Sequence, residues 1–403
     1  MVSEHASPLA ALGGADGGGQ NVLVLELASA LAAQGHEVTV WTRREDTHTP
    51  DRVLARQGVE VRQVSAGPPV PVPKDELVPF LPAFTSRLRQ DWTAERPDVV
   101  HALFWMSGLV ALAAAQSVDV PVVQTFHALG SVKRRHQGSH DTSPSGRIPA
   151  EQAIARRVDR VLATCTDEVA ELLRLGVPRQ RTVVVPGGVD IERFAPHGPE
   201  FERTERPRLV SIGRLVRRKG VDEMIAALRN VPEAELLVAG GSPAGLDQDP
   251  DAPRLLECAA RHGVADRVRL LGPVSRPDVP ALLRSADAVV CVPWYEPFGM
   301  VPLEAMACGR PVVGGAVGGL TDTVVDGVTG LLVPPRRPTL LAAALRGLLA
   351  SRTTAMAFGI AGRDRVQARY GWDRVATTTA QVYRDVLAVR RGTGRIASVG
   401  AVL

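Results

Sequence analysis

The chain has 403 residues, of which 45% are apolar and 22% are charged, and its net charge at pH 7 is +4. Because a single hydrophobic core stops growing near ~250–300 residues, this length predicts two domains. Aromatic residues make up only 4% of the chain and do not alternate with the basic clusters, so a stacking surface for single-stranded nucleic acid is not expected.

Four cysteines, Cys165, Cys258, Cys291 and Cys308, lie far apart and form no CxxC pair. This usage favours free thiols in a reducing compartment, without disulfides or structural zinc. No apolar run approaches the ~18 residues of a membrane span, and the N-terminus lacks a signal-peptide pattern, so we expect a cytoplasmic protein. The basic stretch KRRHQG, 133–138, is compatible with peripheral contact with an anionic membrane. The sequence is also compatible with a homodimer.

Strand-like and helix-like stretches alternate along the first half, as in a parallel sheet with helices on both faces. The segment MVSEH precedes a glycine loop, GGADGGGQN at 13–21, and a helix predicted over 20–35. Because strands usually take ~5–6 residues, the short opening segment favours a reading frame that starts upstream of Met1. Further strands are predicted at 37–43, 59–66, 97–103, 120–128, 160–166 and 182–188.

A polar, proline-containing segment at 195–207 separates this half from a second alternating series. Strands are predicted there at 208–214, 234–241, 267–272, 288–293, 310–317 and 329–335. The expected domains are residues 1–195 and 196–372, followed from 373 to 403 by a helix that returns to the N-terminal domain and a flexible tail. The predicted fold class is α/β, with two Rossmann-like doubly wound domains facing each other across a ligand-binding cleft.

Two glycine-containing turns follow predicted strands. The loop at 13–21 allows close approach of an anion such as a diphosphate, but G-x-G-x-x-G does not fit it, which disfavours a dehydrogenase. In SIGRLVRRKG, Arg214 and Lys219 are predicted to point from the strand end and hold a diphosphate. Arg217 and Arg218 are predicted to face water.

The stretch YEPFGMVPLEAMACG places Glu296 in a loop and Glu304 about two turns along a helix. Glu296 is suited to accept hydrogen bonds from sugar hydroxyls, and the backbone N–H groups around 298–300 are suited to phosphate oxygens. Glu304 would be costly to bury unpaired, and a ribose diol is a suitable partner. The structural alternative is an ion pair between Glu304 and a basic neighbour such as Arg310.

Together these residues resemble the family 4 retaining glycosyltransferases of GT-B fold. The E-x7-E motif from Glu296 to Glu304, the turn GRLVRRKG, the loop GGADGGGQN and the segment VVVPGGVD carry the resemblance over nearly the whole chain. Within that family the sequence is similar to the D-inositol-3-phosphate glycosyltransferases of mycothiol synthesis and, more distantly, to sucrose-phosphate synthases.

The resemblance implies a donor site in the second domain. Arg214 and Lys219 would hold the diphosphate, Glu304 the ribose, and Glu296 the hexose hydroxyls. The remaining donor-binding residues that it implies are Gly19, Phe298, Gly299 and Met300. His127, in QTFHALG, would lie beside the transferred sugar, so the implied catalytic residues are His127, Arg214, Lys219 and Glu296.

The resemblance also implies an acceptor site, formed by Asp16, Asn21, Lys74 and Arg147. The sequence departs from the family pattern where a phosphate-binding tyrosine and threonine are expected, because Phe104 and Ala128 stand there. Two hydroxyl donors are therefore missing. This departure leaves an anionic acceptor and a polyhydroxylated one as alternatives.

The function expected from this reading is transfer of a hexosyl group, with retention, from a nucleoside diphosphate sugar to a hydroxyl of a small, optionally phosphorylated acceptor. A UDP-sugar is the favoured donor. We expect small molecules as the only required partners, no required cofactor and no essential metal, although Mg²⁺ stays compatible with the site. The alternatives are a noncatalytic sugar-nucleotide or glycan-binding protein of the same fold and, less favoured, an NAD(P)-dependent dehydrogenase.

Overall fold

The computed structural model describes the backbone of residues 1–9 and 19–400 and the side chains through residue 391. These residues form two compact units, one with 1–9, 19–186 and 372–400, and one with 187–371. Residues 187–195, which we assigned to the first domain, belong to the second, because Val189 and Phe194 are buried in its core. The tail predicted at the C-terminus extends beyond the described residues.

The first unit contains seven helices and seven strands among its described residues. The helices are α1 (Gly19–Ala33), α2 (Leu81–Ala94), α3 (Trp105–Ala115), α4 (Gly130–Gln137), α5 (Arg147–Arg157), α6 (Thr166–Arg174) and α14 (Trp372–Gly400). The strands are β1 (Thr39–Arg43), β2 (Arg52–Leu54), β3 (Glu60–Val64), β4 (Val100–Leu103), β5 (Val122–Thr125), β6 (Arg160–Ala163) and β7 (Thr182–Val184). All the strands predicted for this half are confirmed, and β2 is additional.

The opening segment takes the place of a first strand. Val2 forms parallel bridges with both Trp41 of β1 and Ala102 of β4. The order across the unit is therefore β2-β3-β1, then Val2, then β4-β5-β6-β7, and β2 alone runs antiparallel to its neighbour. Strand order reverses on either side of Val2, which creates the kind of switch point where doubly wound sheets bind ligands.

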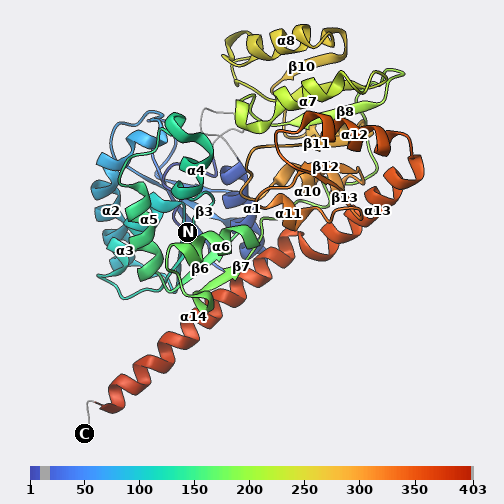
Figure 1. Ribbon diagram of the computed structural model, residues 1–403. Helices are drawn as coiled ribbons and strands as arrows, with labels where there is room; N and C mark the ends of the chain where they lie inside the picture. The colour runs from blue at the N-terminus through green and yellow to red at the C-terminus, as the bar shows by residue number, and fades with distance from the viewer. Residues whose placement is uncertain (10–18, 401–403) are drawn as a thin grey trace. The chain divides into compact units, whose positions relative to one another are not determined.

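Helices cover both faces of this sheet. Val24, Leu27 and Leu31 of α1 follow a helical period and share one apolar cluster with Val375 and Ala380 of α14. The helices α2, α3 and α5 lie together away from α1 (Figure 1). The C-terminal helix α14 thus completes the core of the first unit.

The second unit is built on a sheet of six parallel strands. These are β8 (Arg208–Ile212), β9 (Glu235–Ala239), β10 (Val268–Gly272), β11 (Ala288–Cys291), β12 (Val312–Gly315) and β13 (Gly330–Val333), each at a predicted position. The helices are α7 (Val221–Leu228), α8 (Ala252–Arg261), α9 (Val279–Arg284), α10 (Met300–Ala307), α11 (Leu320–Thr323), α12 (Pro338–Leu349) and α13 (Arg352–Arg369). The strand order β10-β9-β8-β11-β12-β13 places a switch point between β8 and β11.

Alternating side chains of these strands enter two different cores. Leu236 and Val238 of β9 join one apolar cluster, whereas Leu237 and Ala239 join the other. Both faces of each central strand are therefore covered, which explains why the strands read as continuous apolar runs. In the part of the chain that the structure describes, no helix combines the length and apolar character needed to cross a membrane.

Candidate functional site

The turn after β8 positions the predicted diphosphate-binding residues. Arg214 is exposed just beyond the end of β8, and Lys219 lies in the short 3-10 helix η6 (Arg217–Lys219). Gly220 follows with φ +76°, and a Cβ at this position would lie 2.1 Å from the carbonyl oxygen of Val292. Only glycine therefore allows η6 to approach the end of β11, which is the other side of the switch point.

Glu296 lies in the loop that follows β11 and contacts Lys219. Its Oε2 atom accepts a hydrogen bond of 2.6 Å from Lys219 Nζ, and the two side chains are 15% and 24% exposed. Burial disfavours the charged form of Glu296, but Lys219, Arg218 and Arg214 outweigh this effect and hold its pKa below the ordinary value. Arg214, Lys219 and Glu296 therefore form one partly exposed charged cluster.

Arg218 belongs to this cluster, which corrects the prediction that it faces water. Its side chain is half-buried, whereas Arg217 is exposed. Burial and the charge of Arg214 lower the pKa of Arg218, and Glu296 opposes the shift. The backbone of Arg218 is also held in place, because the N–H of Trp294 donates a hydrogen bond of 2.9 Å to the Arg218 carbonyl oxygen. Three cations thus surround one carboxylate, an arrangement suited to a polyanion.

Glu304 lies on α10, with its side chain 3% exposed, and it is paired with a residue that we did not predict. Arg276, between β10 and α9, places its guanidinium 2.5 Å from Glu304 Oε1. Burial raises the pKa of Glu304, and Arg276 opposes the shift. Arg310, which we named as the structural alternative, contacts Glu200 and the Ala286 carbonyl oxygen instead.

The segment between Glu296 and Glu304 contains the start of α10. The Phe298 ring is buried in the core of the second unit and would contact a Cβ at Gly187. A Cβ at Gly318 would lie 2.2 Å from the carbonyl oxygen of Glu296, so the glycines that follow β12 pack against this loop. Met300 begins α10, whose first N–H groups have no acceptor within the helix. The Phe298 side chain is therefore structural, and any contact with a phosphate falls to these backbone groups.

The switch point of the first unit is occupied by Phe104 and the residues after Val2. Phe104 follows β4 with φ +86° and ψ +162°, a conformation that usually only glycine adopts and that costs on the order of 1–3 kcal/mol. Its ring lies 4.6 Å from that of His5, centroid to centroid. His5 Nδ1 is 2.7 Å from Glu4 Oε1, and the Ser107 hydroxyl donates to the other oxygen of Glu4. Sequence reasoning missed Glu4 and His5, since MVSEH contained no recognised motif.

His127 follows β5 and also has a positive φ, +60°. Its Nε2 atom is buried and has no hydrogen-bond partner among the described residues. Burial and the nearby His5 lower the pKa of His127 to about 3, so its imidazole is neutral at pH 7.

Two of the three predicted residues of the glycine loop, Gly19 and Asn21, lie at the start of α1. Gly19 is exposed as the first residue of that helix. Asn21 is buried; its Nδ2 donates to the Ser7 carbonyl oxygen at 3.0 Å, while its Oδ1 has no partner among the described residues. Asp16 lies outside the described residues.

Arg147 and Lys74, the predicted acceptor cations, have different surroundings. Arg147 is the first residue of α5, is 2% exposed, and donates through Nε to Glu151 Oε1 at 2.8 Å. Its guanidinium lies 5.0 Å from the centre of the Phe104 ring. Burial raises the pKa of Glu151, and Arg147 opposes that shift. Lys74 is half-buried in the short helix η2 (Lys74–Glu76).

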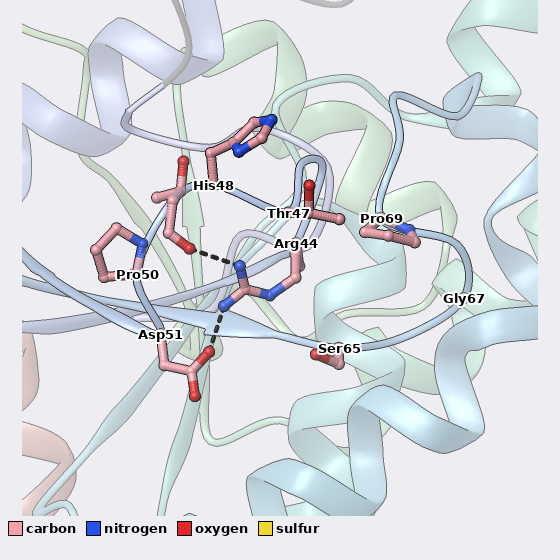
Figure 2. A pocket seen from close by; sticks show the side chains of 9 residues that line it. Arg44, Thr47, His48, Pro50, Asp51, Ser65, Gly67 and Pro69 are labelled. Carbon is pink, nitrogen blue, oxygen red and sulfur yellow. Dashed lines mark hydrogen bonds and ion pairs between the residues drawn. The ribbon is translucent and has the colours of Figure 1, made fainter.

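A separate pocket opens beyond β1 and β3 of the first unit. Arg44 crosses it and donates to the Thr49 carbonyl oxygen at 2.6 Å and to the Asp51 carboxylate (Figure 2). Its lining consists of Arg44, Thr47, His48, Thr49, Pro50, Asp51, Ser65, Gly67 and Pro69. None of these is a predicted site residue, and the cation in the pocket is already paired.

Two family models match the chain and together span most of it. Residues 17–193 match "Glycosyltransferase Family 4", and residues 194–365 match "Glycosyl transferases group 1". The two matches meet close to the division between the structural units.

Similar proteins are known both by sequence and by structure. A D-inositol 3-phosphate glycosyltransferase of Xylanimonas cellulosilytica is 38% identical over 95% of this chain and 95% of its own length. One from Kineococcus radiotolerans is also 38% identical, over 95% and 94%. Among solved structures, a sucrose-phosphate synthase from Thermosynechococcus elongatus superposes with a TM-score of 0.88 at 32% identity, over 96% of this chain and 98% of that one.

Proposed function

Because the chain belongs to the family 4 glycosyltransferases, we propose that it moves a hexosyl group, with retention, from a UDP-sugar to a hydroxyl of a small acceptor. Its fold is the GT-B fold, with two Rossmann-like domains. The second domain binds the donor in this proposal, and the first binds the acceptor. The single observation that carries the proposal is the cluster of Arg214, Arg218 and Lys219 around Glu296 at the switch point of the second sheet.

The charges of this cluster suit the bond changes of the reaction. The bond between the anomeric carbon and the diphosphate oxygen breaks, and negative charge grows on the leaving diphosphate. Arg214 and Lys219 would stabilise that charge, because fixed cations lower the energy of a transition state in which charge develops. Glu296 is kept ionised by its cationic neighbours and would accept hydrogen bonds from the hexose hydroxyls.

The acceptor proton needs a base, and the leaving phosphate can serve as one. In this front-face displacement the acceptor oxygen bonds to the anomeric carbon on the side from which the diphosphate departs. The departing phosphate oxygen takes the acceptor proton, which balances the reaction without a dedicated side-chain base. His127, neutral at pH 7, would contribute hydrogen bonding to the transferred sugar rather than charge.

No resident cofactor is required in this proposal, because side-chain cations neutralise the diphosphate. Transfer should therefore persist in the presence of EDTA. A rate that disappears with EDTA and returns with added Mg²⁺ would assign part of the charge neutralisation to a metal ion instead.

The decisive experiment measures UDP release from UDP-glucose and other UDP-sugars, with and without candidate acceptors. Arg214→Ala and Lys219→Ala should each reduce kcat/KM about 10- to 100-fold, since charge-assisted hydrogen bonds contribute roughly 1.5–3 kcal/mol. Arg229→Ala, an exposed cation of the same unit, is the matched control and should leave the rate unchanged. Wild-type rates in both site variants would exclude the diphosphate assignment, and UDP binding without turnover would favour the noncatalytic alternative.

A further inference from the structure

Arg147 is already occupied by groups of the protein itself. Besides the bond from Nε to Glu151, its Nη1 donates to Ser143 Oγ at 3.2 Å, and its Nη2 donates to the carbonyl oxygen of Ala128. Every nitrogen of the guanidinium therefore has an internal acceptor, and the Phe104 ring covers it from one side. A guanidinium has five N–H groups, so only two remain for a substrate phosphate, which would share the cation with Glu151.

Glu151 takes the position that an external anion would use. Its two oxygens accept hydrogen bonds from the N–H of Gly130, the first residue of α4, at 3.0 and 2.8 Å, and the side chain is fully buried. The start of a helix favours an anion, and here that anion is an internal carboxylate. A phosphate bound beside it would meet like charge in a region of low dielectric constant.

The neighbouring cation, Lys133 of α4, is engaged in the same way. Its Nζ atom lies 3.1 Å from Asp141 Oδ1 and donates to Ser143 Oγ at 2.9 Å. Asp75, next to Lys74 in the chain, lies 3.9 Å from Lys133 Nζ and accepts a hydrogen bond of 2.6 Å from Thr142. Carboxylates therefore accompany both Arg147 and Lys133.

Two uncharged polar atoms near the switch point lack partners among the described residues. They are Asn21 Oδ1, which can only accept a hydrogen bond, and His127 Nε2, which belongs to a neutral ring at pH 7. Asn21 is bonded to Ser7, two residues beyond the His5 ring that packs on Phe104. Hydroxyl groups are the natural partners for such atoms, because a hydroxyl both donates and accepts.

We propose that the acceptor is an uncharged polyhydroxylated molecule, a free sugar or cyclitol, and that Glu151 neutralises Arg147 in place of a substrate phosphate. This inference rests on the proposed function and narrows its substrate class. It departs from the acceptor in the name of the D-inositol 3-phosphate glycosyltransferases, with which this chain is 38% identical. Phe104 and Ala128, which supply no hydroxyl, agree with it.

The first test uses the wild-type protein and matched pairs of acceptors, inositol against D-inositol 3-phosphate and fructose against fructose 6-phosphate. Transfer from UDP-sugars should favour the uncharged member of a pair at least ten-fold in kcat/KM. Calorimetric titration of D-inositol 3-phosphate, with UDP present, should give no binding at millimolar concentrations. Preference for the phosphate ester, or sub-millimolar binding that is lost in Lys74→Ala or Arg147→Ala, would overturn the proposal.

The second test releases Arg147 from its partner. Glu151→Gln keeps hydrogen-bonding capacity but removes the negative charge, so D-inositol 3-phosphate should bind at least ten-fold more tightly than to the wild type. Glu171→Gln is the matched control, because Glu171 is also a buried carboxylate and pairs with Arg135 near the other end of α4. Equal binding by the two variants would show that Glu151 does not exclude the phosphate.

The two tests separate this inference from the proposed function. If the wild-type protein fails to bind UDP or to cleave any UDP-sugar, the proposed function is wrong. The titrations with D-inositol 3-phosphate would still report whether the first unit holds a phosphate ester. If UDP-sugar cleavage is found and phosphorylated acceptors are preferred, only the acceptor inference fails.

Discussion

Arg217 and Arg218 are consecutive in the sequence but have different surroundings. Arg217 is exposed, whereas Arg218 is half-buried beside Arg214 and Glu296. Among the described residues, neither Arg214 nor Arg218 forms an ion pair within 4 Å. Both are attracted by the charge of Glu296 at longer range. Two adjacent guanidinium groups repel each other, and an anionic ligand would relieve that repulsion.

This difference predicts unequal effects of two identical substitutions. Arg218→Ala should weaken UDP binding about ten-fold or more, because a charge-assisted hydrogen bond contributes roughly 1.5–3 kcal/mol. Arg217→Ala removes the same charge from the same turn and should change binding less than about three-fold. Isothermal titration with UDP measures both. Equal losses in the two variants would mean that net charge, not the position of Arg218, determines binding.

Glu304 illustrates how a buried carboxylate limits sequence-based reasoning. Its isolation on an apolar helix indicated that it needs a partner, and the structural alternative to a ribose diol named Arg310 because that residue is near in the sequence. The structure supplies Arg276, which arrives from the loop after β10 and also packs over the Phe194 ring. Such a pairing depends on how distant elements pack, and no local pattern encodes it. The role of Glu304 toward ribose stays a prediction.

Among the elements, the strands that are buried on both faces were the most predictable. The six strands of the second sheet all read as short apolar runs bounded by glycine, proline or polar residues. By contrast, β2 has only three residues, two of them exposed, and so left no apolar pattern to recognise. The bridge made by Val2 was missed for another reason: a single residue between β1 and β4 has no periodicity.

Helix α14 is tied to the first sheet by a buried polar contact. His101 of β4 places Nδ1 2.7 Å from the hydroxyl of Tyr383 on α14 and Nε2 2.8 Å from the hydroxyl of Thr125 on β5. Burial lowers the pKa of His101 from 6.5 to about 3. The imidazole is therefore neutral in the folded protein throughout the physiological pH range.

This contact predicts a specific loss of stability in acid. The folded-state pKa lies below the unfolded value, so the unfolded chain binds the proton first as the pH falls. The contribution of neutral His101 to the free energy of unfolding is complete above about pH 6.5. It is lost as the pH falls toward 3, at up to about 1.4 kcal/mol per pH unit. Urea unfolding at pH 7 and 4.5 should show a smaller acid loss for His101→Gln than for the wild type. His36→Gln, at an exposed position, should keep the wild-type dependence, and identical slopes for all three proteins would contradict the prediction.

At the scale of the whole molecule, the chain is divided into two units with separate cores. The chain passes from the first unit to the second after Pro186 and returns after Gly371, so each unit buries its own apolar clusters. The candidate donor residues Arg214, Lys219, Glu296 and Glu304 belong to the second unit, whereas Gly19, which was also predicted for the donor, belongs to the first. Those predicted for the acceptor that the structure describes, Asn21, Lys74 and Arg147, belong to the first. Donor and acceptor binding can therefore be measured separately.

The last prediction uses this division. UDP at 100 times its dissociation constant stabilises the folded protein by about 2.7 kcal/mol, if it does not bind the unfolded chain. For a unit of this size, each kcal/mol of stabilisation raises Tm by about 2–4 °C, so UDP should raise Tm by about 5–10 °C. Lys219→Ala should lose most of this shift at the same UDP concentration, because its ammonium group no longer meets the diphosphate. Glu151→Gln should keep it in full, because Glu151 belongs to the other unit. Calorimetric scans of the three proteins with and without UDP would contradict the assignment of the donor site if Lys219→Ala kept the wild-type shift or Glu151→Gln lost it.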